Sequence, residues 1–372
     1  MSDLVIPPGL RPRDGRFGSG PSKIRSEALL ALGRRDDIMG TSHRQATVKD
    51  LVGRVQARLG ELYALPDGYR VVLGNGGATQ FWDIAACCLI DRRSAHGAFG
   101  EFGRKFAEGV AAAPFLEPPA VALADPGSVA VPVATEGCDV YAWPQNETST
   151  GVCAPLFRPA GADASALVLI DATSAAGGMH ADLAATDAYY FSPQKNFASD
   201  GGLWVALCSP AALERSARLS ASGRWIPPSL NLTLAAQNSA QRQTLNTPAV
   251  ATLLLLESQL DWLIEGGGLD FAVARTTASS RQLYDWAEAC DLAVPFVADP
   301  QQRSPVVATI EFDDRVDAKR LCAELRANGI VDIEPYRGVG RNQIRVGCYA
   351  AVDPDDVRAL TACLDWMLER LT

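Results

Sequence analysis

The sequence predicts an α/β protein with two domains: a large domain, whose mainly parallel mixed sheet is flanked by helices, and a smaller α+β domain at the C-terminal end. At 372 residues the chain is too long for one small core. From about residue 69 to residue 207, short apolar runs alternate with helix-like segments. Further along the chain the order changes to helix, strand, helix, strand and helix. We therefore expect a large domain at 16–258, a small domain at 259–372 and an N-terminal arm at 1–15.

Each expected element has a local signal in the sequence. In the large domain, short apolar runs that end at polar or glycine-rich residues predict strands at 70–73, 138–143, 166–170, 188–191 and 203–208. The run at 166–170 is purely aliphatic, as is typical of a strand buried on both faces. Helices are expected at 79–90 and 249–264, the second of which is ended by three glycines. In the small domain we expect helices at 271–289, 316–328 and 354–371, with strands at 306–312 and 343–348.

Polar or glycine-rich motifs follow the carboxyl ends of four of these strands. They are Gly74-Asn75-Gly76-Gly77, Asn146-Glu147-Thr148, Asp171, and Ser192-Pro193-Gln194-Lys195-Asn196. In open α/β sheets, ligands bind in the crevice outside the carboxyl ends of the strands. We therefore expect the four motifs to form one site.

Lys195, Asp171 and the glycine turn together favour a pyridoxal-phosphate site. A lysine that forms a Schiff base must be partly desolvated, so that a useful fraction is neutral. The ring nitrogen of this cofactor needs a carboxylate beside it, and its phosphate suits the free N–H groups of a helix N-terminus. Taken singly, each feature has a plainer interpretation: a solvated turn lysine, a helix N-cap and an ordinary strand-to-helix connection. The combination at neighbouring strand ends is what favours the cofactor.

Composition argues against several other classes of protein. The formal net charge is −9 and no basic stripe is present, so we expect no nucleic-acid partner. The nine cysteines form no Cys-x-x-Cys pair and only three histidines occur, so we expect no metal site. The odd, unpatterned cysteines favour a reducing compartment, and we find neither a signal-peptide core nor a membrane-spanning stretch. These observations predict a cytoplasmic protein without a membrane partner.

With these motifs identified, the sequence resembles the phosphoserine aminotransferases, which belong to the class V aminotransferase group of the fold-type-I pyridoxal-phosphate enzymes. The resemblance covers almost the whole chain. Its specific pieces are Phe17-Gly18-Ser19-Gly20-Pro21, Ser42-His43-Arg44, Gly76-Gly77-Ala78-Thr79, Asn146-Glu147-Thr148, Gln194-Lys195-Asn196, Asn246-Thr247-Pro248 and the arginines at 337–345. It implies the fold-type-I architecture, pyridoxal 5′-phosphate as cofactor, and a homodimer with shared active sites.

The resemblance also implies a role for each matching residue. Lys195 would form the Schiff base and carry the proton, and Asp171 would pair with the ring nitrogen. The remaining cofactor contacts would come from Thr148 at the ring hydroxyl, Phe102 stacked on the ring, Gly77, Ala78 and Gln194 at the phosphate, and Asn246 and Thr247 at the phosphate of the neighbouring subunit. Phe102 stands where many relatives have tryptophan, and Ala78 where several have arginine.

For the substrates, the resemblance implies 3-phosphohydroxypyruvate and glutamate, converted reversibly to O-phospho-L-serine and 2-oxoglutarate in serine biosynthesis. Arg345 matches the arginine that holds the α-carboxylate. Arg337, together with His43 and Arg44 from the partner subunit, matches the set that binds the phosphate. Tyr336 stands where some relatives have histidine, and Arg341 lies in a loop that looks longer than theirs.

Other activities stay open at this stage. A serine–glyoxylate or alanine–glyoxylate aminotransferase would share Lys195 and Asp171 but would need fewer arginines. A cysteine desulfurase would have histidine where this chain has Gln194. A non-catalytic pyridoxal-phosphate sensor, or an α/β protein without the cofactor, fits the filled motif positions less well. Whether phosphohydroxythreonine of vitamin B6 biosynthesis is a second substrate is also open.

Overall fold

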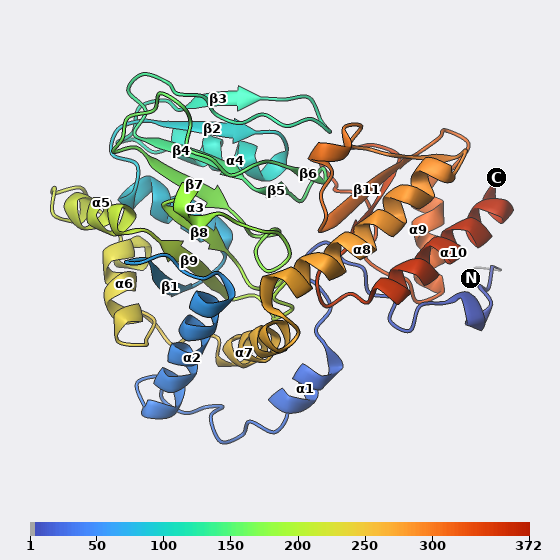
Figure 1. Ribbon diagram of the computed structural model, residues 1–372, viewed down its shortest axis with the longest axis horizontal. Coiled ribbons are helices and arrows are strands. Elements are labelled where there is room, and N and C mark those ends of the chain that lie inside the picture. The colour runs from blue at the N-terminus through green and yellow to red at the C-terminus, as the bar shows by residue number, and fades with distance from the viewer. Residues whose placement is uncertain (1–3) are drawn as a thin grey trace.

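The computed structural model describes residues 4–372, so residues 1–3 of the expected N-terminal arm lie outside it (Figure 1). The α-helices are α1 (Ser26–Leu32), α2 (Ala46–Leu62), α3 (Ala78–Cys88), α4 (Glu101–Ala111), α5 (Pro210–Ser220), α6 (Leu232–Ala240), α7 (Val250–Glu265), α8 (Gly268–Ala289), α9 (Ala318–Ala327) and α10 (Pro354–Leu371). The strands are β1 (Arg70–Asn75), β2 (Ser94–Ala98), β3 (Ala120–Leu123), β4 (Val140–Pro144), β5 (Asn146–Glu147), β6 (Val152–Cys153), β7 (Leu167–Asp171), β8 (Ala188–Phe191), β9 (Leu203–Cys208), β10 (Ala293–Pro295), β11 (Val307–Phe312) and β12 (Gln343–Gly347).

A seven-stranded mixed sheet forms the centre of the larger part, in the order β1-β9-β8-β7-β4-β2-β3. Strands β8, β7, β4, β2 and β3 are parallel to one another. Strand β9 is antiparallel to both β8 and β1, so β1 points the same way as the parallel strands. The carboxyl ends of β1, β4, β7 and β8 therefore lie along one edge of the sheet. This confirms the expected α/β class with a mainly parallel sheet.

Helices cover both faces of this sheet, which explains why its central strands are so apolar (Figure 1). Helices α2 and α7 pack on one face, and α3, α4 and α5 pack on the other. Every residue of β7 and β9 is buried, and Leu169 in β7 is fully buried. Burying a leucine side chain stabilises a fold by roughly 1.5–3 kcal/mol, so runs of this kind fix the centre of the sheet.

The second part of the chain forms a smaller antiparallel sheet, in the order β10-β11-β12. Helices α8, α9 and α10 pack on it and share one apolar cluster with it. Ile6 and Phe17 belong to the same cluster, so the N-terminal segment joins the C-terminal part of the fold (Figure 1). The expected domain boundary at residue 258 falls inside α7, and that division stays a prediction. Between residues 4 and 372, no helix is long and apolar enough to cross a membrane.

Candidate active site

The four motifs that follow strand ends lie around one cavity of about 340 Å³. From the sequence-predicted set, the cavity is lined by Gly77, Ala78, Phe102, Thr148, Asp171, Gln194, Lys195 and Arg345. Gly77 and Ala78 follow β1. The other residues lie near the ends of β4, β7 and β8, in α4 and in β12. Residues far apart in the sequence therefore meet because the carboxyl ends of their strands share one edge of the sheet.

Lys195 lies on the turn after β8 and is only 7% exposed. Its Nζ donates a hydrogen bond to Thr148 Oγ1 at 2.7 Å and lies 5.4 Å from the centre of the Phe102 ring. Burial is the main reason that the pKa of Lys195 falls from 10.5 to about 8. Asp171 opposes this decrease and Arg345 adds to it. The amine is thereby prepared to act as a nucleophile or a base near neutral pH.

The segment before α1 passes directly over the Lys195 side chain. Gly20 has a φ of +144°, and a Cβ atom at this residue would lie 2.9 Å from Lys195 Cε. Only glycine allows both this backbone conformation and this close approach. The segment is also tied to the turn of Lys195, because the Ser22 N–H donates to the Gln194 carbonyl at 2.8 Å. The N-terminal segment therefore helps to keep water away from the amine.

Asp171, at the end of β7, is buried and held at both carboxylate oxygens. Its Oδ1 accepts the backbone N–H of Thr173 at 2.9 Å. Its Oδ2 accepts the indole N–H of Trp82 at 3.0 Å. A carboxylate can accept about four hydrogen bonds, so further acceptor positions remain for a donor in the cavity.

A short chain of hydrogen bonds fixes Thr148, the acceptor of the Lys195 bond. The Thr148 hydroxyl donates to Ser174 Oγ at 2.8 Å, and Ser174 Oγ donates to the Asn146 carbonyl at 3.0 Å. The Asn146 amide returns a hydrogen bond to Ser174 Oγ at 2.8 Å. Since each of these groups is buried, the network holds the hydroxyl of Thr148 in one orientation toward the cavity.

The N-terminus of α3 supplies a place for an anion. Gly77 is its N-cap residue, and Gly77, Ala78 and Thr79 line the cavity. The first N–H groups of a helix have no intrahelical acceptor and favour negative charge. Gln194 lines the same cavity, and its buried Oε1 has no hydrogen-bond partner. A phosphate that carries a proton or is bridged by water would suit both features.

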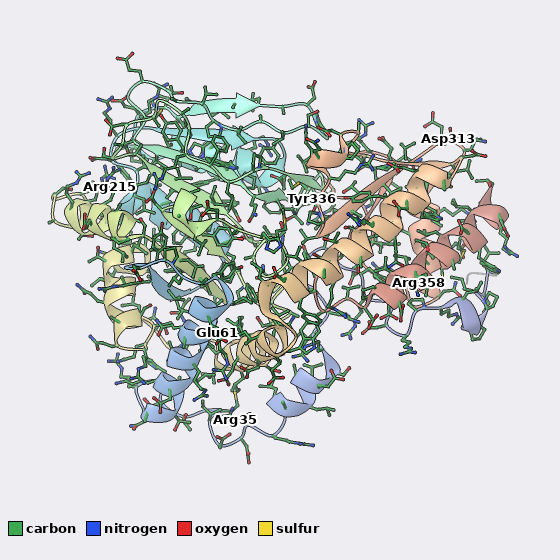
Figure 2. The ribbon with its side chains drawn as sticks, in the orientation of Figure 1. Arg35, Glu61, Arg215, Asp313, Tyr336 and Arg358 are labelled. Atoms are coloured by element: carbon green, nitrogen blue, oxygen red, sulfur yellow. The ribbon has the colours of Figure 1, made fainter. Side chains whose placement is uncertain are left out.

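Arg345, from β12, brings a cation to the cavity. Its Nη1 donates to the Thr148 carbonyl at 2.9 Å, and its guanidinium lies 5.2 Å from the centre of the Tyr336 ring. Its Nε is buried without an acceptor, and burial lowers the pKa of this side chain. Tyr336 lies where the larger part of the fold meets the smaller sheet (Figure 2). An arginine with an unsatisfied donor in a cavity is suited to bind a carboxylate.

Glu147, in the same motif as Thr148, is fully buried. Its two oxygens accept the N–H groups of Phe102 and Gly103, at 3.0 and 3.1 Å, and both the N–H and the hydroxyl of Ser149. Because Phe102 and Gly103 are in the first turn of α4, the carboxylate holds the start of this helix against the site. Burial raises the pKa of Glu147.

The structure leaves the other predicted residues outside the cavity of this chain. His43 and Thr247 meet at the surface, where the Thr247 hydroxyl lies 3.1 Å from His43 Nδ1. The Thr247 carbonyl accepts the side-chain amide of Asn75 at 2.7 Å. Arg44, Asn246 and Arg337 are exposed. For His43, Arg44, Asn246 and Thr247 the expectation was a contribution to a partner's site, and that expectation stays a prediction. The same holds for the role of Arg337.

Arg341, in the loop before β12, has a structural contact instead of a place in the cavity. Its Nε donates to Glu311 Oε1 at 2.6 Å, and its guanidinium lies 5.1 Å from the centre of the Phe296 ring. The sequence places this arginine in a loop that looks longer than the loop of relatives, beside the expected substrate-binding arginines. In this chain Arg341 forms an ion pair with Glu311 outside the cavity.

Several residues of the site were not found by sequence reasoning. They are Trp82, Thr173 and Ser174, which all line the cavity, and Glu147 in its capping role. The signal for Thr173 and Ser174 was present, since both lie within three residues after Asp171. Trp82 gave no signal, because an apolar residue in a helix is normally a core residue. In residues 4–372 no group of three or more His, Cys, Asp or Glu side chains is arranged to hold a metal ion.

Comparisons with known proteins show that the chain belongs to the class-V aminotransferases. A family model described as aminotransferase class-V matches residues 132–333. A phosphoserine aminotransferase of Nocardioides sp. is 60% identical over 374 aligned residues, covering 100% of both chains. A putative phosphoserine aminotransferase of Mycolicibacterium vanbaalenii is 58% identical over 369 residues, covering 99% of both chains.

Solved structures show the same fold at much lower identity. A phosphoserine aminotransferase from Cytophaga hutchinsonii superposes with a TM-score of 0.85 at 22% identity, over 95% of this chain and 99% of that one. A phosphoserine aminotransferase from Bacillus circulans subsp. alkalophilus superposes with a TM-score of 0.83 at 20% identity, over 96% of this chain and 99% of that one. These similarities concern the fold alone.

Proposed function

We propose that this chain, which belongs to the class-V aminotransferases and within them to the phosphoserine aminotransferases, transfers an amino group reversibly between glutamate and 3-phosphohydroxypyruvate. The products would be 2-oxoglutarate and O-phospho-L-serine, as in serine biosynthesis. The single observation that carries the proposal is the convergence of Lys195, Asp171, the α3 N-terminus and Arg345 on one cavity. The close relatives of the same name, aligned over the full chain, support the choice of substrates.

The cavity fits pyridoxal 5′-phosphate as the cofactor. Asp171 would hold the ring nitrogen, because its two oxygens keep acceptor positions free beside the bonds from Trp82 and Thr173. The N-terminus of α3 and Gln194 would hold the phosphate, Thr148 the ring hydroxyl, and Phe102 one face of the ring. When bound, this cofactor supplies an electron-accepting ring that stabilises negative charge on the carbon next to the amino group.

Lys195 is the residue that we propose to carry the proton. With a pKa of about 8, roughly a tenth of the free amine is neutral at pH 7, so it can accept a proton. The Lys195 Nζ would take the proton from the α-carbon of the substrate and deliver it to the cofactor carbon that bears the transferred nitrogen. Thr148, fixed by its bond to Ser174, keeps the amine directed into the cavity.

Both substrates carry a carboxylate beside the reacting carbon and a second anionic group at the far end. We propose that Arg345 binds the α-carboxylate of each, since the buried Nε–H of its partly buried side chain has no acceptor. Arg337, with His43 and Arg44 from a partner subunit, would bind the distal phosphate. A serine–glyoxylate or alanine–glyoxylate aminotransferase would not need this second set of cations.

The site as a whole would belong to a homodimer. Asn246 and Thr247 are exposed and lie outside the cavity of their own chain, which suits residues that complete a neighbour's phosphate site. We also propose a cytoplasmic location, because the nine cysteines are free in the structure. A division into domains at 16–258 and 259–372, with an arm at 1–15, is part of the same proposal. So is a second reaction on phosphohydroxythreonine.

The test is an absorbance spectrum of the purified protein, before and after addition of phosphoserine. A visible band that disappears with phosphoserine and returns with 2-oxoglutarate is the expected result. The matched control is Lys195→Ala, which should lack the band and nearly all turnover. A band that responds to alanine or serine but not to phosphoserine would move the substrate assignment to the glyoxylate-type enzymes. A protein that stays colourless with added pyridoxal phosphate would refute the cofactor and the reaction together.

A further inference from the structure

Trp82 is a cavity residue to which the reaction so far assigns no role. It lies in the second turn of α3, and its side chain is only 7% exposed. Its indole N–H donates to Asp171 Oδ2 at 3.0 Å. Its ring stacks on Phe106 of α4, with the ring centres 5.8 Å apart and the planes 15° from parallel. The indole is thus held by one helix and braced by another, with its polar atom directed at the carboxylate.

The bond from Trp82 decides how the Asp171 carboxylate is oriented. The torsion that turns a carboxylate about its bond to Cβ is soft, so one hydrogen bond leaves a broad range of orientations. Thr173 holds Oδ1 from the main chain, and Trp82 holds Oδ2 from across the site. Two donors on different oxygens and different elements fix the plane. The remaining lone pairs then keep one direction, into the cavity that both side chains line.

Tryptophan is chemically suited to this task. An indole N–H is a donor only, so it can be satisfied here only by an oxygen that offers a lone pair. The smaller phenylalanine would keep an aromatic ring beside Phe106 but would leave Oδ2 without its donor. Hydrogen bonds to charged groups are about twice as strong as neutral ones. The main effect of the substitution would therefore be the loss of this hydrogen bond to the Asp171 carboxylate.

We propose that Trp82 is a positioning residue for the amino-transfer reaction, whose indole N–H fixes the Asp171 carboxylate in the orientation that accepts a hydrogen bond from the protonated ring nitrogen of the cofactor. The inference rests on the proposed function, because it assumes pyridoxal phosphate in this cavity. It adds a residue whose contribution passes through Asp171 and not through contact with the substrate.

The test compares Trp82→Phe with a matched control, Trp286→Phe. The indole of Trp286 also donates to a carboxylate, Asp365 Oδ1 at 2.7 Å, but on α8 and α10, outside the cavity. For Trp82→Phe we expect the affinity of the full chain for pyridoxal phosphate to fall about tenfold, the scale of one charge-assisted hydrogen bond. Trp286→Phe should bind the cofactor as the wild type does. Near-ultraviolet circular dichroism checks that both variants are folded.

The second measurement separates positioning from packing. Wild type and Trp82→Phe are loaded either with pyridoxal phosphate or with its N-methyl analogue, whose ring nitrogen carries a permanent charge and no proton. The half-reaction with phosphoserine should be about tenfold slower in Trp82→Phe with the natural cofactor. With the N-methyl analogue, the two proteins should differ by less than about threefold, because the ring nitrogen then has no N–H to donate to Asp171.

The outcomes are distinct. An undiminished difference with the N-methyl analogue would mean that Trp82 acts through packing, and would overturn the inference. Unchanged cofactor affinity and half-reaction in Trp82→Phe would overturn it as well. Failure of the wild type to react with phosphoserine would instead refute the proposed function, independently of Trp82.

Discussion

The pH at which Lys195 becomes reactive is the most direct test of how the site works. Burial lowers the pKa of this amine to about 8. The experiment follows the modification of the cofactor-free protein between pH 6 and pH 10. Only the neutral amine reacts with carbonyl compounds, so the rate of modification follows the neutral fraction of each lysine.

The expected magnitude follows from the two pKa values. With a pKa of about 8, roughly one Lys195 amine in eleven is neutral at pH 7. At the ordinary value of 10.5, the fraction would be about one in 3,000. The neutral fraction of Lys195 at pH 7 is therefore about 300-fold above that of an ordinary lysine.

Reductive methylation with limiting formaldehyde, read out by peptide mass spectrometry, measures this for each lysine separately. The chain has five lysines, so the peptides are readily distinguished. Lys105 is the internal comparison, because Glu101 at 2.9 Å raises its pKa. The Lys195 rate should rise tenfold per pH unit up to about 8 and then level off, while the Lys105 rate keeps rising. Limited access lowers the absolute rate of a buried amine but leaves the midpoint unchanged.

Two variants test the direction of each neighbour's effect. Asp171 raises the pKa of Lys195, so Asp171→Asn should move the midpoint to lower pH. Arg345 lowers it, so Arg345→Gln should move the midpoint to higher pH. Movement of both midpoints in the same direction would contradict opposite effects of Asp171 and Arg345. A Lys195 rate that still rises tenfold per pH unit between pH 9 and 10 would contradict a pKa of about 8 for Lys195.

Three further predictions concern substrate binding and stability. Arg345→Ala should weaken the binding of phosphoserine and of glutamate by tenfold or more, measured as KM in steady-state kinetics, whereas Arg337→Ala should weaken the binding of phosphoserine most. An effect of Arg345→Ala on only one of the two substrates would contradict a shared α-carboxylate site. Glu147→Gln places an amide donor against N–H donors, so urea unfolding should show a loss of roughly 2–4 kcal/mol, and a loss below about 0.5 kcal/mol would contradict the capping role. Lys195→Met should stabilise the cofactor-free protein at pH 7 by about 1–3 kcal/mol. Because the pKa of Lys195 is lowered in the folded state, the wild type should regain that stability as the pH rises from about 8 to 10.5. A gain in stability that does not depend on pH would exclude burial of the charge as its cause.

The sequence predicted the part of the site that depends on strand ends. Asp171 and Lys195 follow apolar runs directly, and parallel strands bring their carboxyl ends to one edge whatever the details of packing. The glycine turn before α3 was found for the same reason. These are local signals, and the structure brings all three to one cavity. Which role each plays with the cofactor stays a prediction.

The parts that were not predicted depend on contacts between distant elements. Strand β2 (Ser94–Ala98) has small residues and a histidine in place of a β-branched run, and it is buried only because neighbouring strands and α4 cover it. The capping role of Glu147 could not be derived without α4, whose first turn it binds. The bond from Trp82 to Asp171 depends on how α3 is rotated, which no local pattern specifies.

The reactivity of Lys195 depends on burial more than on any neighbouring charge, and this connects the site to the rest of the fold. Desolvation is the largest cause of its lowered pKa, while the charges of Asp171 and Arg345 act in opposite directions. Part of that burial comes from the segment around Gly20, which passes over the amine. The same segment is anchored to the C-terminal part, since Phe17 lies in its apolar cluster and the Gly347 N–H donates to the Phe17 carbonyl at 2.8 Å. Packing of the C-terminal part therefore stabilises the neutral amine, and a substitution that loosens this anchor should raise the pKa of Lys195 without touching the cavity.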